Sequence, residues 1–208
     1  MKNMTQVTVN NRPLNHSFVE GQTVTDIINL VQADNNGREV LTSMTIDGER
    51  FECDGEHEVF RRNLNRCTNI DLYFQRPIDL AFEALESTSA YIDVISGKIN
   101  ELVTLYNENQ LTAANHKFGE VIEIMDLFVQ LMSKIHRTIR EDMREKFVKS
   151  QTIQNLEIHL LSVMKALIPA KEKDDVIMLC DLLEYELIDN LTQWKIKAIP
   201  ELKRLKNN

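Results

Sequence analysis

The chain has 208 residues, of which 43% are hydrophobic and 27% are charged, and its formal net charge is −8. This length is enough for one medium domain or two small ones to bury a core without disulfides or metal. The negative charge argues against general binding to DNA, RNA or anionic lipid, because those partners need a positive field. No run of about eighteen apolar residues occurs, so we expect no signal peptide, no transmembrane helix and a cytoplasmic location.

The chain changes character near Pro77. Short segments with alternating hydrophobicity and most of the glycines precede this residue, whereas long segments with helical periodicity and few helix breakers follow it. We therefore predict an α+β protein with two domains, residues 1–77 and residues 78–208.

The first domain is predicted to contain short strands and one helix. Asp47-Gly48 is a typical hairpin turn between two strands. Thr23 or Thr25 can cap a helix whose apolar residues recur at intervals of three and four. The expected strands cover residues 7–9, 14–19, 41–46, 50–53 and 70–74. The expected helix has its apolar residues over 24–31 and ends near Asn35-Asn36-Gly37.

This order of elements resembles the ubiquitin-like β-grasp superfold, through the Val7/Val9 hairpin, the helix over residues 24–31 and the strand over residues 70–74. The resemblance implies a small scaffold whose exposed sheet face docks another protein. Conjugated ubiquitin-like proteins end in a free Gly-Gly, whereas this strand continues through residues 75–77 into a second domain. Conjugation is therefore not implied.

The second domain is predicted to consist of four amphipathic helices. Apolar residues recur at helical spacing over residues 78–106 and again over residues 118–139. A third helix is expected over residues 153–167, ending before Pro169 because proline disfavours helix at the preceding residue. A fourth is expected over residues 174–195. Striped helices with short connections favour an antiparallel four-helix bundle with two long helices.

The helical part also carries a family resemblance. The string from Leu179 to Leu187 resembles an element of uncharacterised bacterial helical proteins, and the layout of residues 78–208 is similar to that of cytoplasmic flagellar export chaperones. The resemblance implies a bacterial adaptor or chaperone-like protein with a link to motility.

No motif has the spacing of a known catalytic or metal site. The Glu-x-x-His motif of carboxylate metal bundles is absent, as are the glycine patterns that cradle phosphate or present a serine nucleophile. Cys53, His57 and Cys67 form the one sulfur and nitrogen cluster, but structural zinc needs four ligands. Glu120 and Glu123 are expected on a solvated or salt-bridged surface. We therefore expect no catalysis, no metal and no cofactor.

Basic residues gather in three places, each with acidic neighbours or a helix end that explains it. Nucleic acid is therefore not the expected partner. If the chain did bind a nucleic acid, the C-terminal basic group is where we expect the contact. The groups are Arg61, Arg62 and Arg66; Arg137, Arg140 and Arg144; and Lys195, Lys197, Lys203, Arg204 and Lys206.

Two features predict a partner-binding surface. The long helices carry more apolar seam than two shorter helices cover, which would leave Ile99 or Met132 open to a partner. Asp181, Glu184 and Tyr185 are expected to cluster beside a leucine stripe, either as the margin of the core or as an aromatic anchor with flanking acids.

The sequence therefore predicts a non-enzymatic cytoplasmic module that binds a protein partner or a second copy of itself through apolar helix faces. The alternative is an enzyme or a nucleic-acid-binding regulator with an unrecognised site. An enzyme would need polar side chains converging in a pocket, and a nucleic-acid binder would need its basic groups on one surface.

Overall fold

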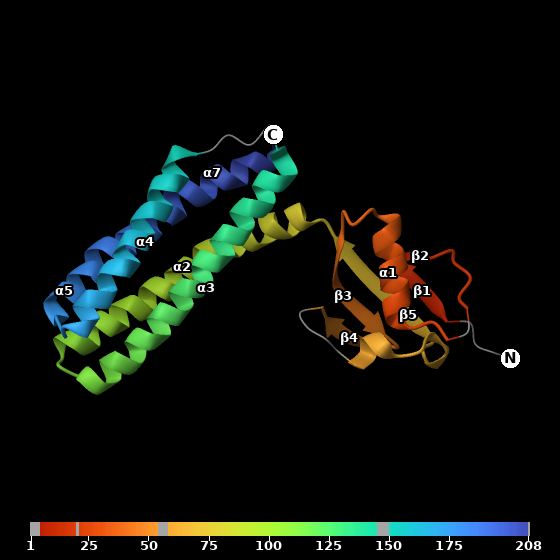
Figure 1. Cartoon of the computed structure of the whole chain (residues 1–208), viewed down its shortest axis with the longest axis horizontal. Coiled ribbons are helices and arrows are strands. Elements are labelled where there is room, and N and C mark those ends of the chain that lie inside the picture. The colour runs from red at the N-terminus through yellow and green to blue at the C-terminus, as the bar shows by residue number, and fades with distance from the viewer. Residues whose placement is uncertain (1–4, 20, 54–57, 145–149, 208) are drawn as a thin grey trace. The chain divides into compact units, whose positions relative to one another are not determined.

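The computed structural model describes residues 5–19, 21–53, 58–144 and 150–207. It is a mixed α+β structure in which a five-stranded sheet precedes a series of helices (Figure 1). The chain divides into two compact units, Met1–Leu80 (unit 1) and Ala81–Asn208 (unit 2). None of the described helices combines the length and the hydropathy that crossing a membrane requires.

Unit 1 is a sheet with strand order β2-β1-β5-β3-β4 and one helix, α1 (Val24–Asp34). The pair β1 and β5 is parallel, and the other neighbouring strands are antiparallel. The strands are β1 (Gln6–Val9), β2 (Arg12–Pro13), β3 (Val40–Ile46), β4 (Glu49–Glu52) and β5 (Asn69–Gln75).

Two hairpin turns depend on residues that tolerate a positive φ. Asn10 and Asn11 have φ values of 49° and 63° between β1 and β2, and Asp47 and Gly48 have values of 50° and 89° between β3 and β4. Two-residue turns of this kind match the twist of the strands that they join. The predicted turn at Asp47-Gly48 is therefore confirmed.

The strand predicted over residues 14–19 is wrong. The backbone N–H of Leu14 still donates to the carbonyl of Val7 at 2.9 Å, but β2 itself covers only Arg12–Pro13. Residues 14–19 lie outside the five strands of the sheet.

Helix α1 is held at its start by a capping box. The Thr23 backbone N–H donates to Asp26 at 2.7 Å, and the Asp26 N–H donates back to the Thr23 hydroxyl at 3.4 Å. The hydrogen bond from the Thr23 backbone lowers the pKa of Asp26. Of the two predicted caps, Thr23 is confirmed. The helix buries Val24, Ile27, Ile28 and Val31 in a cluster with Val7, Met44, Ile46, Ile70, Leu72 and Phe74 of the sheet.

Unit 2 contains three long helices followed by a C-terminal helical segment, residues 176–207 (Figure 1). The long helices are α2 (Pro77–Asn107), whose first four residues belong to unit 1, α3 (Leu111–Met143) and α4 (Gln151–Glu172). The C-terminal segment consists of α5 (Val176–Asp181), a π turn (Leu182–Leu187), α6 (Ile188–Gln193), a second π turn (Trp194–Ala198), α7 (Ile199–Arg204) and a 3₁₀ turn (Leu205–Asn207).

Helix α4 continues through Pro169 to Glu172, so the predicted end before this proline is wrong. Pro169 and Ile168 are exposed, whereas Leu167 before them and Ala170 after them are buried. Water can therefore solvate the carbonyl group that loses its N–H partner, and the buried neighbours hold the last turn in place.

The two π turns follow from the spacing of the leucines. Leu179, Leu183, Leu187 and Leu191 repeat every four residues, and all are fully buried. In an α-helix of 3.6 residues per turn, each four-residue step overshoots a full turn by about 40°. A pure α-helix would rotate this stripe off the core, and the wider π turn takes up the excess. The predicted core position of these leucines is confirmed.

Candidate functional site

The structure separates the five residues predicted to bind a partner. Ile99 and Met132 are buried within unit 2, so the expectation that they lie open to a partner is wrong. The C-terminal segment runs on through α7, where the sequence predicts a short tail helix or a kink from Ile199, and its pairs Lys195–Asp93 and Lys203–Glu86 show that it covers α2. Asp181, Glu184 and Tyr185 are exposed, and the Tyr185 side chain is 65% exposed. These three lie at the first π turn, beside the buried leucine stripe.

Large apolar side chains are also exposed on α4. Ile158, Leu161 and Ile168 are 67%, 49% and 58% exposed. Their spacings of three and seven residues place them on one face of the helix. In unit 1 the large apolar residues described as exposed are Val19 and Val40 alone. The described apolar surface is therefore concentrated in unit 2.

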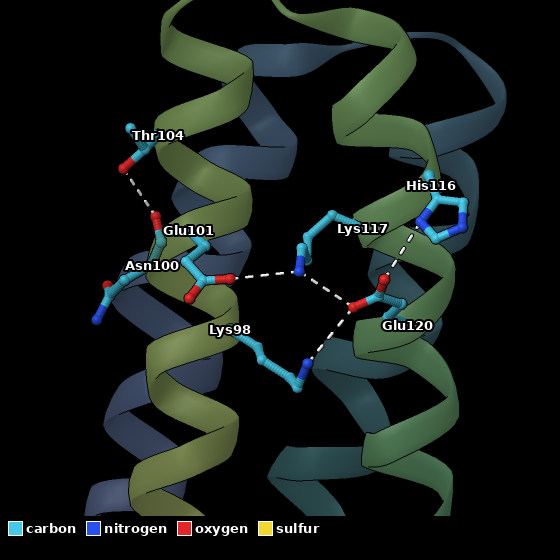
Figure 2. Close-up of polar contacts among 7 residues, drawn as sticks. All are labelled: Lys98, Asn100, Glu101, Thr104, His116, Lys117 and Glu120. Carbon is cyan, nitrogen blue, oxygen red and sulfur yellow. Dashed lines mark hydrogen bonds and ion pairs between the residues drawn. The ribbon is translucent and has the colours of Figure 1, made fainter.

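The outer seam between α2 and α3 is closed by ion pairs (Figure 2). Lys117 Nζ lies 3.3 Å from Glu101 and 3.1 Å from Glu120, and Lys98 Nζ lies 3.4 Å from Glu120. His116 Nδ1 lies 3.2 Å from the other oxygen of Glu120. Glu120 thus connects the two helices, and its predicted salt-bridged surface position is confirmed.

The charges in this network favour one another's ionised forms. Hydrogen bonds to Glu120 and Glu101 raise the pKa of Lys117, and the hydrogen bond from Lys117 lowers the pKa of Glu120. Both groups therefore stay charged across the neutral pH range. Since every acid and base here has a partner of opposite sign, the network can clamp two helices, but it offers no free acid or base for proton transfer.

The seam between α3 and α4 holds a partly open cavity of about 440 Å³. Its apolar side is formed by Val129 and Met132 of α3, Leu160 and Leu161 of α4, and Trp194 of the second π turn. Met132, Leu160 and Trp194 are buried, whereas Leu161 is 49% exposed. Its polar side includes His136, Arg137 and Arg140 of α3 and Gln154 and Glu157 of α4. Of the five residues predicted to bind a partner, Met132 lies here, and Arg137 and Arg140 come from one of the three predicted basic groups. The helical pattern of α3 indicated a buried Met132 but could not show that α4 leaves a space beside it.

Two ion pairs lie at the polar side of the cavity. His136 Nδ1 is 3.3 Å from Glu157, and Arg137 Nε is 3.7 Å from Glu141. Within the described ranges, no carboxylate lies within ion-pair distance of Arg140. The exposed guanidinium group of Arg140 therefore has no acid among the described residues to compete with a ligand.

Buried polar atoms gather on the C-terminal segment near the cavity. Asn190 Nδ2 donates to the carbonyl of Leu156 at 3.1 Å and lies 3.0 Å from His159 Nδ1, which ties the segment to α4. Asn190 Oδ1, Gln193 Oε1 and Trp194 Nε1 are buried without a hydrogen-bond partner in the part of the chain that the structure describes. Such atoms are uncommon in folded proteins and mark places where water or a ligand binds.

The predicted sulfur and nitrogen cluster cannot be followed in full, because His57 lies outside the described residues. Cys67 is buried, and burial raises the pKa of its thiol, while Cys53 is half-buried. Over residues 5–19, 21–53, 58–144 and 150–207, no three His, Cys, Asp or Glu side chains are placed to hold a metal ion.

Acidic partners neutralise part of the basic groups. Lys195 Nζ lies 2.6 Å from Asp93, and Lys203 Nζ lies 2.7 Å from Glu86. These pairs tie the C-terminal segment to α2 and reduce the positive field that a nucleic acid would need.

The fold and the site define an α+β protein whose helical unit combines an ion-paired seam, a cavity and an exposed apolar face. The chain belongs to the family described as Domain of unknown function (DUF8042), whose model matches residues 83–197, more than half of the chain. No curated protein and no solved structure matches the chain significantly. The matched region includes all of α3 and α4, and therefore both the cavity seam and the exposed face of α4.

Proposed function

We propose that this protein is a non-enzymatic protein–protein interaction module of the cytoplasm, an adaptor or chaperone-like protein that binds through an apolar helix face. The observation that carries the proposal is the row of exposed Ile158, Leu161 and Ile168 on α4. Large apolar side chains in water raise the free energy of the folded chain, and contiguous exposed apolar surface marks association sites.

The partner that fits this face best is an amphipathic helix. Ile158 and Ile168 are ten residues apart, which is about 15 Å along an α-helix. A partner helix laid alongside would present its own apolar residues at intervals of three, four and seven. Tyr185 with Asp181 and Glu184 is a second proposed anchor, because an exposed aromatic ring beside acids suits a partner with an apolar and basic surface.

The architecture proposed for this role is a β-grasp domain followed by an antiparallel four-helix bundle. A mixed sheet of order β2-β1-β5-β3-β4 with one packed helix supports the first part. For the second part, polar contacts form a closed circuit: α2 to α3 through Lys98–Glu120, α3 to α4 through His136–Glu157, α4 to the C-terminal segment through His159–Glu186, and that segment to α2 through Lys195–Asp93. The resemblance to bacterial flagellar export chaperones fits an adaptor of this shape.

The test compares two exposed sites on the full chain. The double variant Ile158→Glu/Ile168→Glu places charges on the proposed face, and Ile177→Glu places one charge on α5 as a matched control. Sedimentation equilibrium measures self-association, and affinity capture from the native host with mass spectrometry identifies partners. We expect a specific complex for the wild type and for Ile177→Glu, and its loss in the double variant with an unchanged thermal unfolding midpoint.

Two results would contradict the proposal. One is a wild type that is strictly monomeric at high concentration and captures no partner. The other is a double variant that associates as strongly as the wild type, because that result removes the α4 face from the interaction.

A further inference from the structure

The cavity between α3 and α4 has the size and the mixed lining of a small-molecule site. Its volume of about 440 Å³ falls within the range of roughly 300–1,000 Å³ that is usual for ligand pockets. Met132, Leu160 and Trp194 supply an apolar side that is almost completely shielded from water. An apolar ligand body would therefore gain by leaving water for this space.

The charged side chains that line the cavity are Arg137, Arg140 and Glu157, so the lining is net positive even with His136 neutral. This sign is opposite to the charge of the chain, which is −8. Glu157 faces His136 at 3.3 Å, and Arg137 also contacts Glu141 at 3.7 Å. Arg140 has no such acid among the described residues. A guanidinium group binds a carboxylate through two parallel hydrogen bonds, so the polar side suits an anion.

Trp194 gives a second and independent indication. Its side chain is only 2% exposed, and its indole N–H has no acceptor in the described part of the chain. A buried donor without an acceptor costs free energy, so native structures seldom keep one without a reason. Trp194 also begins a π turn, a feature that is frequent at functional sites.

We infer that this cavity binds a small organic anion with an apolar body, such as an alkyl or aryl carboxylate. The apolar body lies against Met132, Leu160 and the ring of Trp194, and the carboxylate lies toward Arg137 and Arg140 with one oxygen accepting from the Trp194 N–H. Leu161 of the exposed α4 face also lines the cavity, but Ile158 and Ile168 do not, so variants at those two residues separate the cavity from the protein-binding face.

The probe is decanoate, titrated into the full chain by calorimetry and by fluorescence. Trp194 is the one tryptophan of the sequence, so its emission reports directly on the cavity. We expect saturable binding of one decanoate per chain with a change in Trp194 emission. The uncharged analogue decanol should bind at least tenfold more weakly, because it lacks the charge that the arginines recognise.

Three variants locate the site. Arg137→Gln/Arg140→Gln should weaken decanoate binding at least tenfold, whereas Arg204→Gln, an exposed arginine of α7, should leave it unchanged. Trp194→Phe keeps an aromatic ring but removes the N–H, so calorimetry should show binding several-fold weaker. Far-ultraviolet circular dichroism measures whether each variant is folded. If Trp194→Phe does not fold, the arginine variants still test the site.

The inference is overturned if decanoate causes no saturable heat or fluorescence change, if decanol binds as well as decanoate, or if the double arginine variant binds like the wild type. Its failure is distinct from failure of the proposed protein interaction. Ile158→Glu/Ile168→Glu should still bind decanoate, and Arg137→Gln/Arg140→Gln should still form the protein complex.

Discussion

Helix α3 has two long seams, and they are built differently. Toward α2, the outer edge is closed by Lys98, Glu101, Lys117 and Glu120, which form a network of opposite charges (Figure 2). Toward α4, the seam leaves a cavity of about 440 Å³ beside Trp194. The first arrangement satisfies its polar groups internally, whereas the second leaves an arginine and an indole N–H without partners among the described residues.

This difference separates a structural seam from a candidate binding seam. Charges that are mutually paired are already stabilised and have little to gain from a ligand. An unsatisfied buried donor beside a cavity raises the free energy of the folded chain, and a ligand that accepts its hydrogen bond removes that cost. Polar residues occur at both seams. Whether each polar group already has a partner therefore says more about ligand binding than the presence of polar residues does.

The largest expected effect comes from removing a side chain that connects α3 with its neighbours. The Phe128 ring centroid lies 6.4 Å from that of Tyr91 on α2 and 6.0 Å from that of Trp194. Phe128→Ala should lower the free energy of unfolding by about 3–5 kcal/mol. Urea unfolding followed by Trp194 fluorescence measures this loss, and a loss below about 1 kcal/mol would show that the ring is not part of the core.

A smaller effect sharpens the comparison between a filled core and a cavity wall. Ile99 is fully buried, whereas Met132 borders the cavity. Ile99→Ala should cost about 2–5 kcal/mol, and Met132→Ala should fall at the low end of that range because fewer atoms pack against it. Neither change should alter the oligomeric state measured by sedimentation, since both side chains are internal. If Ile99→Ala instead dissociated an oligomer of the wild type without lowering the free energy of unfolding, Ile99 would belong to an interface between chains.

The smallest effect tests the ion-pair seam through pH. The pKa of Glu120 is lowered from its ordinary value of 4.5, so its pairing stabilises the folded chain above that pH and this contribution disappears as the pH falls through the folded pKa. Glu120→Gln should therefore be less stable than the wild type at pH 7, and the two should converge in acid. Glu123→Gln, an exposed neighbour, is the control and should differ little at either pH. High salt should also shrink the Glu120 difference.

Local chemistry explains which elements were predictable. Thr23 and Asp26 cap α1 through atoms three residues apart, and Asp47-Gly48 turns the chain by its own backbone preference. Pro169 was misjudged because burial of Leu167 and Ala170, in the same turn of helix, outweighs one lost hydrogen bond. The end of β2 was misjudged because strand length depends on how much partner strand is present.

Periodicity in the sequence determined which side chains turn inward, because burying an apolar stripe is favourable whatever the neighbouring helix is. Leu183, Leu187 and Leu191 follow that rule, and Tyr185 lies outside it. The tertiary structure alone decided that Ile99 and Met132 are covered, that Glu120 contacts lysines of both α2 and α3, and that α3 and α4 separate enough to leave a cavity beside Trp194. Those outcomes depend on distances between helices, which are set by the packing of many side chains at once and leave no local pattern in the chain.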